Sequence, residues 1–492
     1  MALLKEIKEY YGDVELYIDG EFRKSESDYF MEVMNPALDK PIGRVPFATP
    51  EEVDEAVDAA VAAFERWRDV PVPNRVQYLF RMKEVLERHK EEIARIIVQN
   101  HGKHIDEARG EVRRAIENVE AAIGAAYTLA KGEALDQVAP SIDEYVIREP
   151  LGAFAIISPF NFPVMVPFWF MPYALAVGAT VVIKPSEITP IPFYWVNKLL
   201  DEVGLPLGVV NVVYGRAEVG ERLITHPDIQ GVAFVGSTAV ARKIYELAGR
   251  HGKRVLLQAG AKNYAVVMPD ADMDRAATNL ISSFFGNTGQ RCLANAVLVP
   301  VGDAYERIVP RFVELAKGMK LGYGLDEDVD MTPLVSRKAL ERVHRYIEIG
   351  LEEGARLTLD GRNPVVDGYP DGYFVGPTIF EDVTPDMRIA QEEIFGPVAS
   401  IIRAESLDEA IEMANSTIYG NASSIFTSSG RVAREFRRRI KAGNIGINVG
   451  IAAPMAFYPF AGMKESFFGV IHGQITSVHF FTDTKVVIER WW

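Results

Sequence analysis

Apolar residues at helical spacing mark the first part of the chain. Residues 49–67 read TPEEVDEAVDAAVAAFERW, in which Thr49 stands as N-cap, Pro50 follows, and Glu52 completes a capping box. The apolar positions of that segment are Val53, Val57, Val61 and Phe64. This period predicts an amphipathic helix with one packed and one charged face, and residues 73–132 continue with helical character.

From about residue 151 the pattern changes to short runs rich in Val, Ile and Ala, separated in most cases by helical segments. The first series comprises GAFAIISPF, ATVVIKPS, GVVNVVYG, GVAFVGS and RVLLQAG. The second series comprises YAVVMPDA, NAVLVPV, PVASIIRA, ASSIFT and NIGINVG. Continuous apolar runs alternating with helices predict parallel strands covered on both faces. We therefore expect two doubly wound α/β units, joined near residues 258–264.

Two further segments alternate apolar and polar residues, as exposed or edge strands do: 144–150 (EYVIREP) and 478–492 (VHFFTDTKVVIERWW). An unpaired hydrophobic strand at a chain end is prone to aggregate, so pairing with another subunit is expected. The stretch FNFPVMVPFWFMPYALAVGATVVI comes closest to a membrane span. Its three prolines and its lack of basic flanks favour buried protein interior instead.

Composition narrows the class of protein. At about 150 residues per domain, 492 residues suggest two or three domains. A net charge of −15 opposes nucleic acid and anionic membranes, and the first residues show no signal-peptide pattern. A single cysteine allows no internal disulfide, so the fold does not depend on an oxidising compartment. These properties predict a cytoplasmic protein with neither a nucleic-acid nor a membrane partner.

Residues that directly follow the runs of the first series are candidates for binding a nucleotide, although G-x-G-x-x-G and the P-loop motif are absent. After ATVVI come Lys184 and Glu187, a cation and a carboxylate able to contact a phosphate or ribose. An ordinary solvated loop is the alternative. After GVAFV come Gly236 and Ser237, which permit close backbone approach and cap a helix whose first N–H groups suit a pyrophosphate. A simple helix cap is the alternative there, but together the two positions predict a nucleotide crevice.

Two positions are candidates for catalysis. Asn161 lies at a strand end between prolines and aromatics, where a stiffly held amide N–H suits an oxyanion, although an asparagine turn is the commoner use of such a sequence. Cys292, the only cysteine, is either a small buried hydrophobe or a nucleophile. Its polar approach GNTGQ favours the nucleophile, and Arg291 beside it could stabilise a thiolate. No catalytic metal is expected, because His101 and His104 have no obvious third ligand.

Four motifs in order make the chain resemble the aldehyde dehydrogenase superfamily over essentially its whole length. They are PFNFP with IKPSE, FVGST, FGNTGQRC and QEEIFGPV. The resemblance implies an α/β, aldehyde dehydrogenase-like fold of two doubly wound α/β domains plus a small β oligomerisation element, assembled as a homodimer or homotetramer. It places the dinucleotide-binding domain at 1–132 and 151–258, the catalytic domain at 259–467, and the oligomerisation element at 133–150 and 468–492.

The resemblance also implies a role for each matching residue. Cys292 would attack the aldehyde carbonyl, with the Asn161 amide and the Cys292 N–H as oxyanion hole, and hydride transfer to a nicotinamide would leave a thioester. The implied cofactor-binding residues are Ser158, Phe160, Lys184, Ser186, Glu187, Gly236, Ser237, Glu393 and Phe395. The implied substrate residues are Arg114, Phe162 and Trp169. Glu187 would crowd a 2′-phosphate, which favours NAD as cofactor but leaves NADP open.

One departure bears on what receives the acyl group. Most hydrolytic members carry glutamate in E-L-G-G-K-N, whereas this chain has Gln258 in QAGAKN, and an amide takes no proton from water near neutral pH. The departure resembles the methylmalonate- or malonate-semialdehyde dehydrogenase branch, as do PFNFP, HGKRV, VVMPDA, YFVGPTIF and FFTDTK. Gln258 and Tyr264 stand where that branch usually has asparagine and histidine.

In that branch coenzyme A accepts the acyl group, because a thiol supplies its own thiolate and needs less help from a base. Arg114 would bind the carboxylate of a semialdehyde, unless it is a solvated arginine on a charged helix. Two other functions stay open: a hydrolytic aldehyde dehydrogenase that releases the free acid, and a catalytically silent structural or binding protein.

Overall fold

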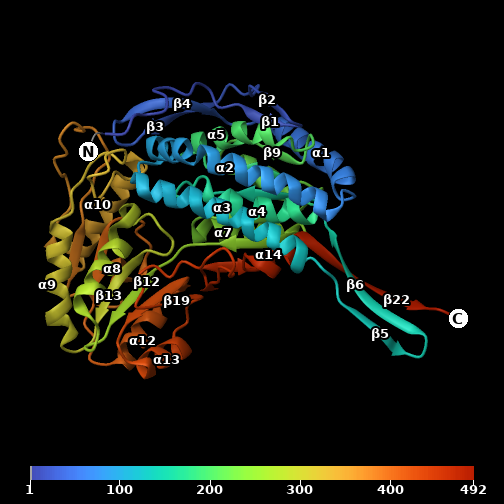
Figure 1. The fold of residues 1–492 in the computed structure, drawn as a ribbon. Helices are drawn as coiled ribbons and strands as arrows, with labels where there is room; N and C mark the ends of the chain where they lie inside the picture. Colours follow the sequence, from blue (N-terminus) through green and yellow to red (C-terminus); the bar gives the residue numbers. More distant parts are fainter. Residues whose placement is uncertain (1–2) are drawn as a thin grey trace.

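The first of two large sheets is built around the runs of the first series. The computed structural model describes residues 3–492 (Figure 1). The strands of this sheet are β1 Leu16–Ile18, β2 Glu21–Arg23, β7 Ala153–Ile157, β8 Thr180–Lys184, β9 Val210–Val212, β10 Ile229–Val235, β11 Arg254–Gln258 and β21 Phe467–Gly469. Their order is β2-β1-β9-β8-β7-β10-β11-β21, and the five from β9 to β11 are parallel. The predicted first α/β unit is confirmed.

The second sheet holds the runs of the second series. Its strands are β12 Asn263–Val267, β13 Asn295–Pro300, β14 Arg356–Leu359, β15 Thr378–Glu381, β16 Val398–Ile401, β18 Ala422–Phe426 and β19 Asn444–Ile447. Their order is β14-β15-β16-β13-β12-β18-β19. Residues of β12 alternate between two apolar clusters, with Tyr264 and Val266 on one face and Ala265 and Val267 on the other. Strands β14 and β15 were not among the predicted runs.

Helices cover the first sheet. They are α1 Pro50–Trp67, α2 Val72–His101, α3 Ile105–Thr128, α4 Met165–Val177, α5 Pro190–Leu200, α6 Ala217–Thr225 and α7 Thr238–Arg250. The predicted capping box begins α1, since Thr49 and Glu52 exchange side-chain and backbone hydrogen bonds of 2.8 and 3.2 Å. Every residue of α4 is buried, so the apolar stretch is protein interior as expected. Among the described residues, no helix is long and apolar enough to cross a membrane.

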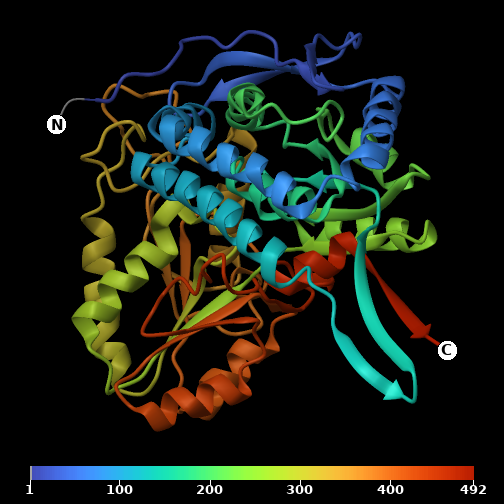
Figure 2. The same cartoon turned by 45° about the vertical axis from the view of Figure 1, so that its right-hand side comes forward.

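Further helices cover the second sheet: α8 Met273–Phe285, α9 Ala304–Lys317, α10 Arg337–Glu352, α11 Arg388–Gln391, α12 Leu407–Ser416 and α13 Gly430–Arg439. Two small ribbons complete the body, one of β3 Phe30–Asn35 with β4 Lys40–Pro46 and one of β17 Tyr419–Gly420 with β20 Met463–Lys464. Figure 2 shows α2 and α3 side by side, and α3 also packs on α4. The first turns of α3 lie next to the loop that leads into α4, since Glu111 of α3 bonds the N–H groups of Val164 and Met165.

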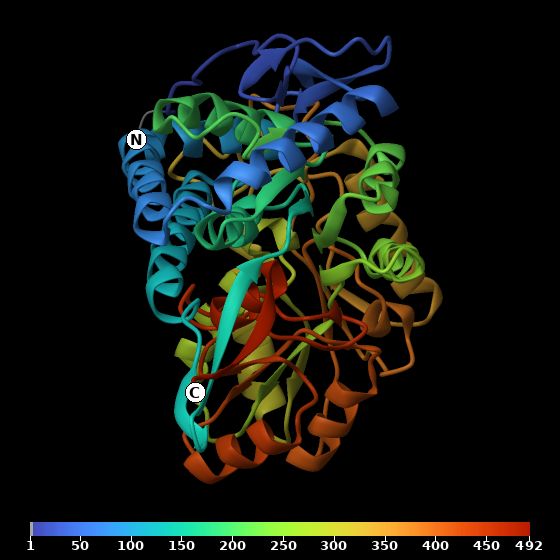
Figure 3. The same cartoon turned by 90° about the vertical axis from the view of Figure 1, so that its right-hand side faces the viewer.

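A β arm projects from the body and carries the C-terminus (Figure 1), and in Figure 3 this arm faces the viewer. It consists of β5 Ala134–Ala139, β6 Ile142–Pro150 and β22 Thr482–Arg490, in the order β22-β6-β5. The strand predicted over 478–492 was wrong in its first part, because Gln474–Phe481 form the helix α14. There Phe480 and Phe481 pack on the ring of Phe154 at 5.3 and 4.8 Å. Burial against the first sheet overrides the alternating pattern at that end.

Candidate active site

The nucleotide candidates lie at one edge of the first sheet. Strands β8, β7 and β10 are neighbours and parallel, so Lys184, Ser158 and Gly236 follow adjacent carboxyl ends. The chain runs from β7 outward through β8 to β9 and then returns to the other side of β7 at β10. Such a reversal of strand order opens a crevice at the carboxyl ends, which is where open α/β sheets bind ligands.

Lys184 and Glu187 lie together at that edge. The Lys184 Nζ donates to the carbonyl oxygen of Gly215 at 2.6 Å and lies 3.6 Å from a Glu187 carboxylate oxygen. Burial lowers the pKa of the Lys184 ammonium, while Glu187 opposes that effect. The Ser186 hydroxyl accepts from the Ile188 N–H at 3.3 Å and so shapes the turn. The alternative for this position was an ordinary solvated loop, whereas the structure shows a hydrogen-bonded turn with a buried lysine.

Ser237 is the N-cap of α7, as predicted, but its side chain makes no capping hydrogen bond. The neighbouring Thr238 hydroxyl is engaged: it accepts from the Gly260 N–H at 2.9 Å and donates to the Glu465 carbonyl at 3.2 Å. The start of α7 therefore presents unpaired first-turn N–H groups beside an uncommitted hydroxyl, an arrangement that suits an anionic group.

Asn161 and the loop before Cys292 are joined directly. The Asn161 side-chain nitrogen donates to the Gln290 carbonyl oxygen at 3.1 Å, and Asn161 is 5% exposed. An amide nitrogen carries two hydrogens, so this bond fixes the amide and leaves one N–H for another acceptor. The Cys292 carbonyl accepts from the side chains of Asn263 and Asn421, both at 2.8 Å, which holds the cysteine backbone in place.

Cys292 opens into a cavity of about 490 Å³. The three predicted substrate residues, Arg114, Phe162 and Trp169, line the same cavity. The Arg114 guanidinium pairs with Glu117 at 3.0 Å and lies 3.0 Å from the Met455 sulfur. The structure thus brings the candidate nucleophile, an apolar wall and a cation to one cavity.

The environment of Cys292 disfavours the free thiolate. Burial, followed by the negative charge of Glu393, raises the pKa of the thiol to about 12. Arg291 is not among the main groups that shift this pKa, and its guanidinium pairs with Glu107 at 2.5 Å. Arg291 lines the same cavity as Cys292, and its role in stabilising a thiolate stays a prediction.

Glu393 and Phe395 reach the site from the second sheet. A Glu393 carboxylate oxygen accepts from the Ala261 N–H at 2.8 Å, and burial raises the pKa of the Glu393 carboxyl to about 7. The Phe395 ring meets the Phe160 ring edge-on at 5.7 Å, and Phe160 in turn stacks on His101 at 6.2 Å. Aromatic residues from both α/β units therefore meet near the carboxyl ends of the first sheet.

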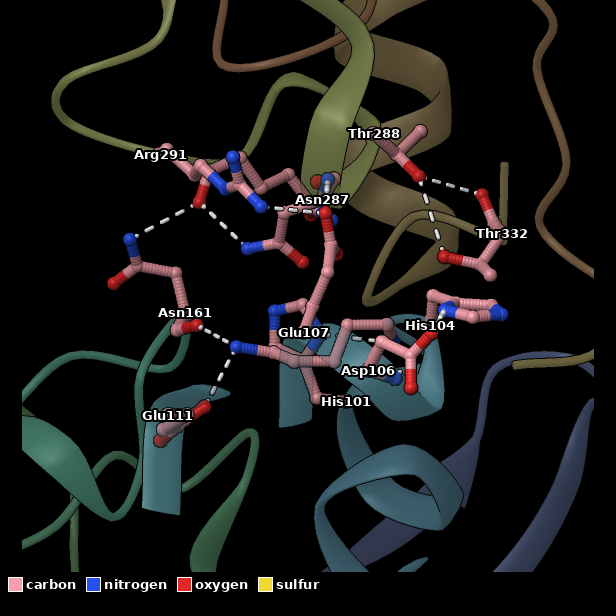
Figure 4. A network of polar contacts seen from close by, with 12 residues as sticks. His101, His104, Asp106, Glu107, Glu111, Asn161, Asn287, Thr288, Arg291 and Thr332 are labelled. Carbon is pink, nitrogen blue, oxygen red and sulfur yellow. Dashed lines mark hydrogen bonds and ion pairs between the residues drawn. The ribbon is translucent and has the colours of Figure 1, made fainter. Parts of the chain in front are cut away.

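A network of polar contacts ties these loops to the start of α3 (Figure 4). In this network the Nδ1 atoms of His101 and His104 each accept a backbone N–H two residues further on, at 3.2 Å. Between them, Lys103 reaches inward to Glu111 and to the Asn161 carbonyl, both at 2.7 Å.

Comparison with known proteins agrees with this geometry. The sequence model of the aldehyde dehydrogenase family matches residues 22–487. The chain belongs to the aldehyde dehydrogenase family. Malonate-semialdehyde dehydrogenase 1 of Geobacillus kaustophilus is 47% identical over 475 residues, which cover 96% of this chain and 97% of that protein.

Solved aldehyde dehydrogenase structures share the fold. A methylmalonate-semialdehyde dehydrogenase from Oceanimonas doudoroffii matches with a TM-score of 0.95 and 40% identity, over 98% of this chain and 99% of that one. An NAD+ complex of an aldehyde dehydrogenase from Bacillus cereus matches with a TM-score of 0.93 and 34% identity, over 97% and 96%. The family and the fold class predicted from the four motifs are confirmed.

The cavity of Cys292 also holds a histidine that no sequence motif indicated. His472 lines the cavity of Cys292, and its Nδ1 contacts the Gln258 side-chain nitrogen. The imidazole stacks on Trp169 at 4.6 Å and on Phe460 at 5.4 Å, and burial lowers its pKa to about 3. Gln258 is 3% exposed, and its Oε1 makes no hydrogen bond within the described part of the chain. No sequence pattern links positions 258 and 472.

Proposed function

We propose that the protein oxidises a short semialdehyde acid with NAD+ and transfers the resulting acyl group from Cys292 to coenzyme A. The observation that carries the proposal is the neutral pair of Gln258 and His472 where a hydrolytic enzyme needs a base. The relatives named malonate- and methylmalonate-semialdehyde dehydrogenase support the choice of substrate.

The residues at the carboxyl edge of the first sheet suit a dinucleotide. The uncommitted Ser237 hydroxyl and the first N–H groups of α7 suit a pyrophosphate, and Lys184 with Glu187 suits the adenosine ribose. Ser158, Phe160, Ser186 and Gly236 would lie along this edge, and Glu393 with Phe395 would lie at the nicotinamide end. When bound, the oxidised nicotinamide accepts the hydride. A carboxylate at position 187 favours NAD+ over NADP+.

Cys292 and Asn161 then perform the first half of the reaction. The Cys292 sulfur bonds to the aldehyde carbon, and its proton is lost to solvent as negative charge develops on the carbonyl oxygen. The second N–H of the Asn161 amide and the Cys292 backbone N–H would stabilise that oxygen. Loss of hydride from the carbon converts the adduct into a thioester on Cys292.

The second half needs no base at position 258 if the acceptor is a thiol. The thiolate of coenzyme A forms a carbon–sulfur bond with the acyl carbon, and the bond from that carbon to Cys292 breaks, which returns Cys292 as thiolate. A thiol supplies a thiolate fraction near neutral pH, whereas water needs a group that removes its proton. Neither the amide of Gln258 nor an imidazole of pKa about 3 can do so effectively.

Arg114 and Arg291 support a substrate that carries a carboxylate. Both residues line the cavity of Cys292, and the guanidinium of each is paired with a glutamate, Arg114 with Glu117 and Arg291 with Glu107. Arg114→Ala should raise the KM for malonate semialdehyde and leave the KM for propionaldehyde unchanged. Arg88→Ala is the control, because Arg88 does not line the cavity and its guanidinium pairs with the exposed Glu202 at 2.9 Å.

The direct test follows the absorbance of NADH during oxidation of malonate semialdehyde with and without coenzyme A, with separation of acyl thioester from free acid. Turnover should depend on coenzyme A, and steady hydrolysis that ignores coenzyme A would refute acyl transfer. Gln258→Glu should increase the share of free acid, whereas Gln258→Met, which also breaks the contact with His472, should not.

We also propose that the β arm joins subunits into a dimer or tetramer. Strand β22 pairs with β6 along its whole length, yet Val486 and Ile488 are 63% and 64% exposed. Apolar residues at an accessible sheet edge favour pairing with a second copy of the chain.

A further inference from the structure

A buried ion pair lies directly behind the loop that carries Asn161. The Lys103 Nζ donates to Glu111 and to the Asn161 carbonyl oxygen, both at 2.7 Å, and lies 4.1 Å from the centre of the Phe162 ring. Both charged side chains are 0% exposed. The other Glu111 oxygen accepts from the N–H groups of Val164 and Met165, at 2.8 and 3.2 Å. The pair thus holds both the carbonyl of Asn161 and the start of α4.

One turn earlier on the same helix, Glu107 holds the loop that leads to Cys292. One of its carboxylate oxygens accepts from the Asn287 N–H at 2.6 Å and from Arg291 at 2.5 Å. That loop needs restraint, because Asn287 and Thr288 both have a φ of +51°, in the left-handed region that is costly for residues other than glycine. Thr288 is further fixed by its hydroxyl, which donates to the Thr332 carbonyl at 2.7 Å.

Figure 4 shows the carboxylates of α3 beside the two loops, and these loops meet at the Gln290 carbonyl. That oxygen accepts from the side chains of Asn161 and Asn287, both at 3.1 Å. Each loop is irregular and contributes one half of the proposed oxyanion hole, the Asn161 amide or the Cys292 N–H.

We propose that Lys103, Glu111 and Glu107 are positioning residues that clamp the two halves of the oxyanion hole to the first turns of α3. The inference rests on the proposed role of Asn161. A charged pair is a costly way to fill a buried space, since two apolar side chains of similar size would suffice for packing alone. What apolar side chains cannot do is bond the Asn161 carbonyl and two amide N–H groups at once.

The test is a paired substitution that removes the tether without stranding a buried charge. Lys103→Met with Glu111→Gln deletes the bond to the Asn161 carbonyl, while the glutamine oxygen can still accept from Val164 and Met165. The burst of NADH in the first turnover, in the full-length enzyme with saturating NAD+ and aldehyde, measures acylation. A displacement near 1 Å at a reacting group slows a reaction by up to about 100-fold, so we expect the burst to slow by about 10- to 100-fold.

A merely structural role is separated by three readouts. The Kd for NAD+, from quenching of protein fluorescence, should stay within about 2-fold of the wild-type value. In an Asn161→Ala background, the paired substitution should add less than about 2-fold, because the group that it positions is already gone. Lys253→Met is the matched control, as that lysine donates to the carbonyls of His226, Pro227 and Ile229 on another part of the fold.

The outcomes are distinct. If Asn161→Ala leaves the burst unchanged, the proposed role of Asn161 fails. If Asn161→Ala slows the burst and the paired substitution does not, or if their effects multiply, the clamp fails. Should the paired variant not fold, Glu107→Ala tests the same clamp at a partly exposed position and should slow the burst by about 10-fold. A normal burst in that variant would overturn the proposal.

Discussion

Gly289→Ala should damage catalysis far more than an alanine at another glycine of the same backbone conformation. Gly289 has a φ of +72°, and a Cβ there would lie 2.3 Å from the carbonyl oxygen of Gly396. Real Cβ contacts stay above 3.0 Å, so the loop or the facing carbonyl has to move by about 0.7 Å. Gly252, with a φ of +65° and open space around a Cβ, is the matched control.

The magnitude follows from these two contributions. The left-handed conformation alone costs alanine about 1 kcal/mol of stability, so Gly252→Ala should lose about that much and keep its activity. Gly289→Ala should lose more, and because Cys292 lies three residues away, a shift of 0.7 Å should slow acylation by about 10- to 100-fold. Denaturant unfolding measures the first effect and the NADH burst the second. A normal burst in Gly289→Ala, with a stability loss equal to that of Gly252→Ala, would refute the reasoning.

Three further predictions concern charge and assembly. Because the chain has one cysteine, alkylation by iodoacetamide reports on Cys292 alone. With a thiol pKa of about 12, the alkylation rate of the free enzyme should rise about tenfold per pH unit from pH 7 to 10, and a plateau near pH 8 would contradict this. Glu393→Gln should raise the alkylation rate at each pH above 7, because it removes a negative charge that raises the pKa of the thiol. Burial lowers the pKa of the Lys262 ammonium to about 7, so between pH 7 and about 10 the unfolded chain binds one proton more than the folded protein. The free energy of unfolding of the wild type should therefore rise with pH through that range, and Lys262→Met should remove this rise. If urea unfolding gives the same pH dependence for both proteins, the prediction is wrong. Val486→Asp with Ile488→Asp should lower the assembly mass measured by light scattering, and an unchanged mass would count against assembly through the arm.

The sheets and the helix α1 were predictable from sequence because their information is local. Runs buried on both faces, such as β7 and β12, show continuous apolar residues, and α1 shows its cap and its period within one segment. Strand β15, Thr378–Glu381, also lies buried in a sheet, but four residues with two polar side chains carry too little pattern to be recognised. The helix α14 was missed because its burial against Phe154 depends on a contact across more than 300 residues.

The site divides in the same way. Cys292 and Asn161 were predicted from motifs, and the structure places them in adjoining loops, with Phe162 and Trp169 on the cavity of Cys292. His472 was missed, because its significance lies in touching Gln258, 214 positions away. Contacts at such separation are made by the fold, and one sequence read alone has no means of pairing them.

The protonation states of the groups around Cys292 indicate that the proposed chemistry depends on how Asn161 and Cys292 are positioned, rather than on proton transfer by a side chain. Gln258 is neutral, the His472 imidazole has a pKa of about 3, and the cysteine thiol has a pKa of about 12, so none of the three exchanges a proton readily near pH 7. Glu393, with a pKa of about 7, does exchange one, but its carboxylate is bonded to the Ala261 N–H. A site of this kind activates water poorly and suits an acceptor such as a thiol, which supplies its own ionised fraction. Its rate then depends on how firmly Asn161 and Cys292 are held, and the proposed clamp holds them through Glu107 and Glu111 on α3 and through Lys103, which lies just before that helix.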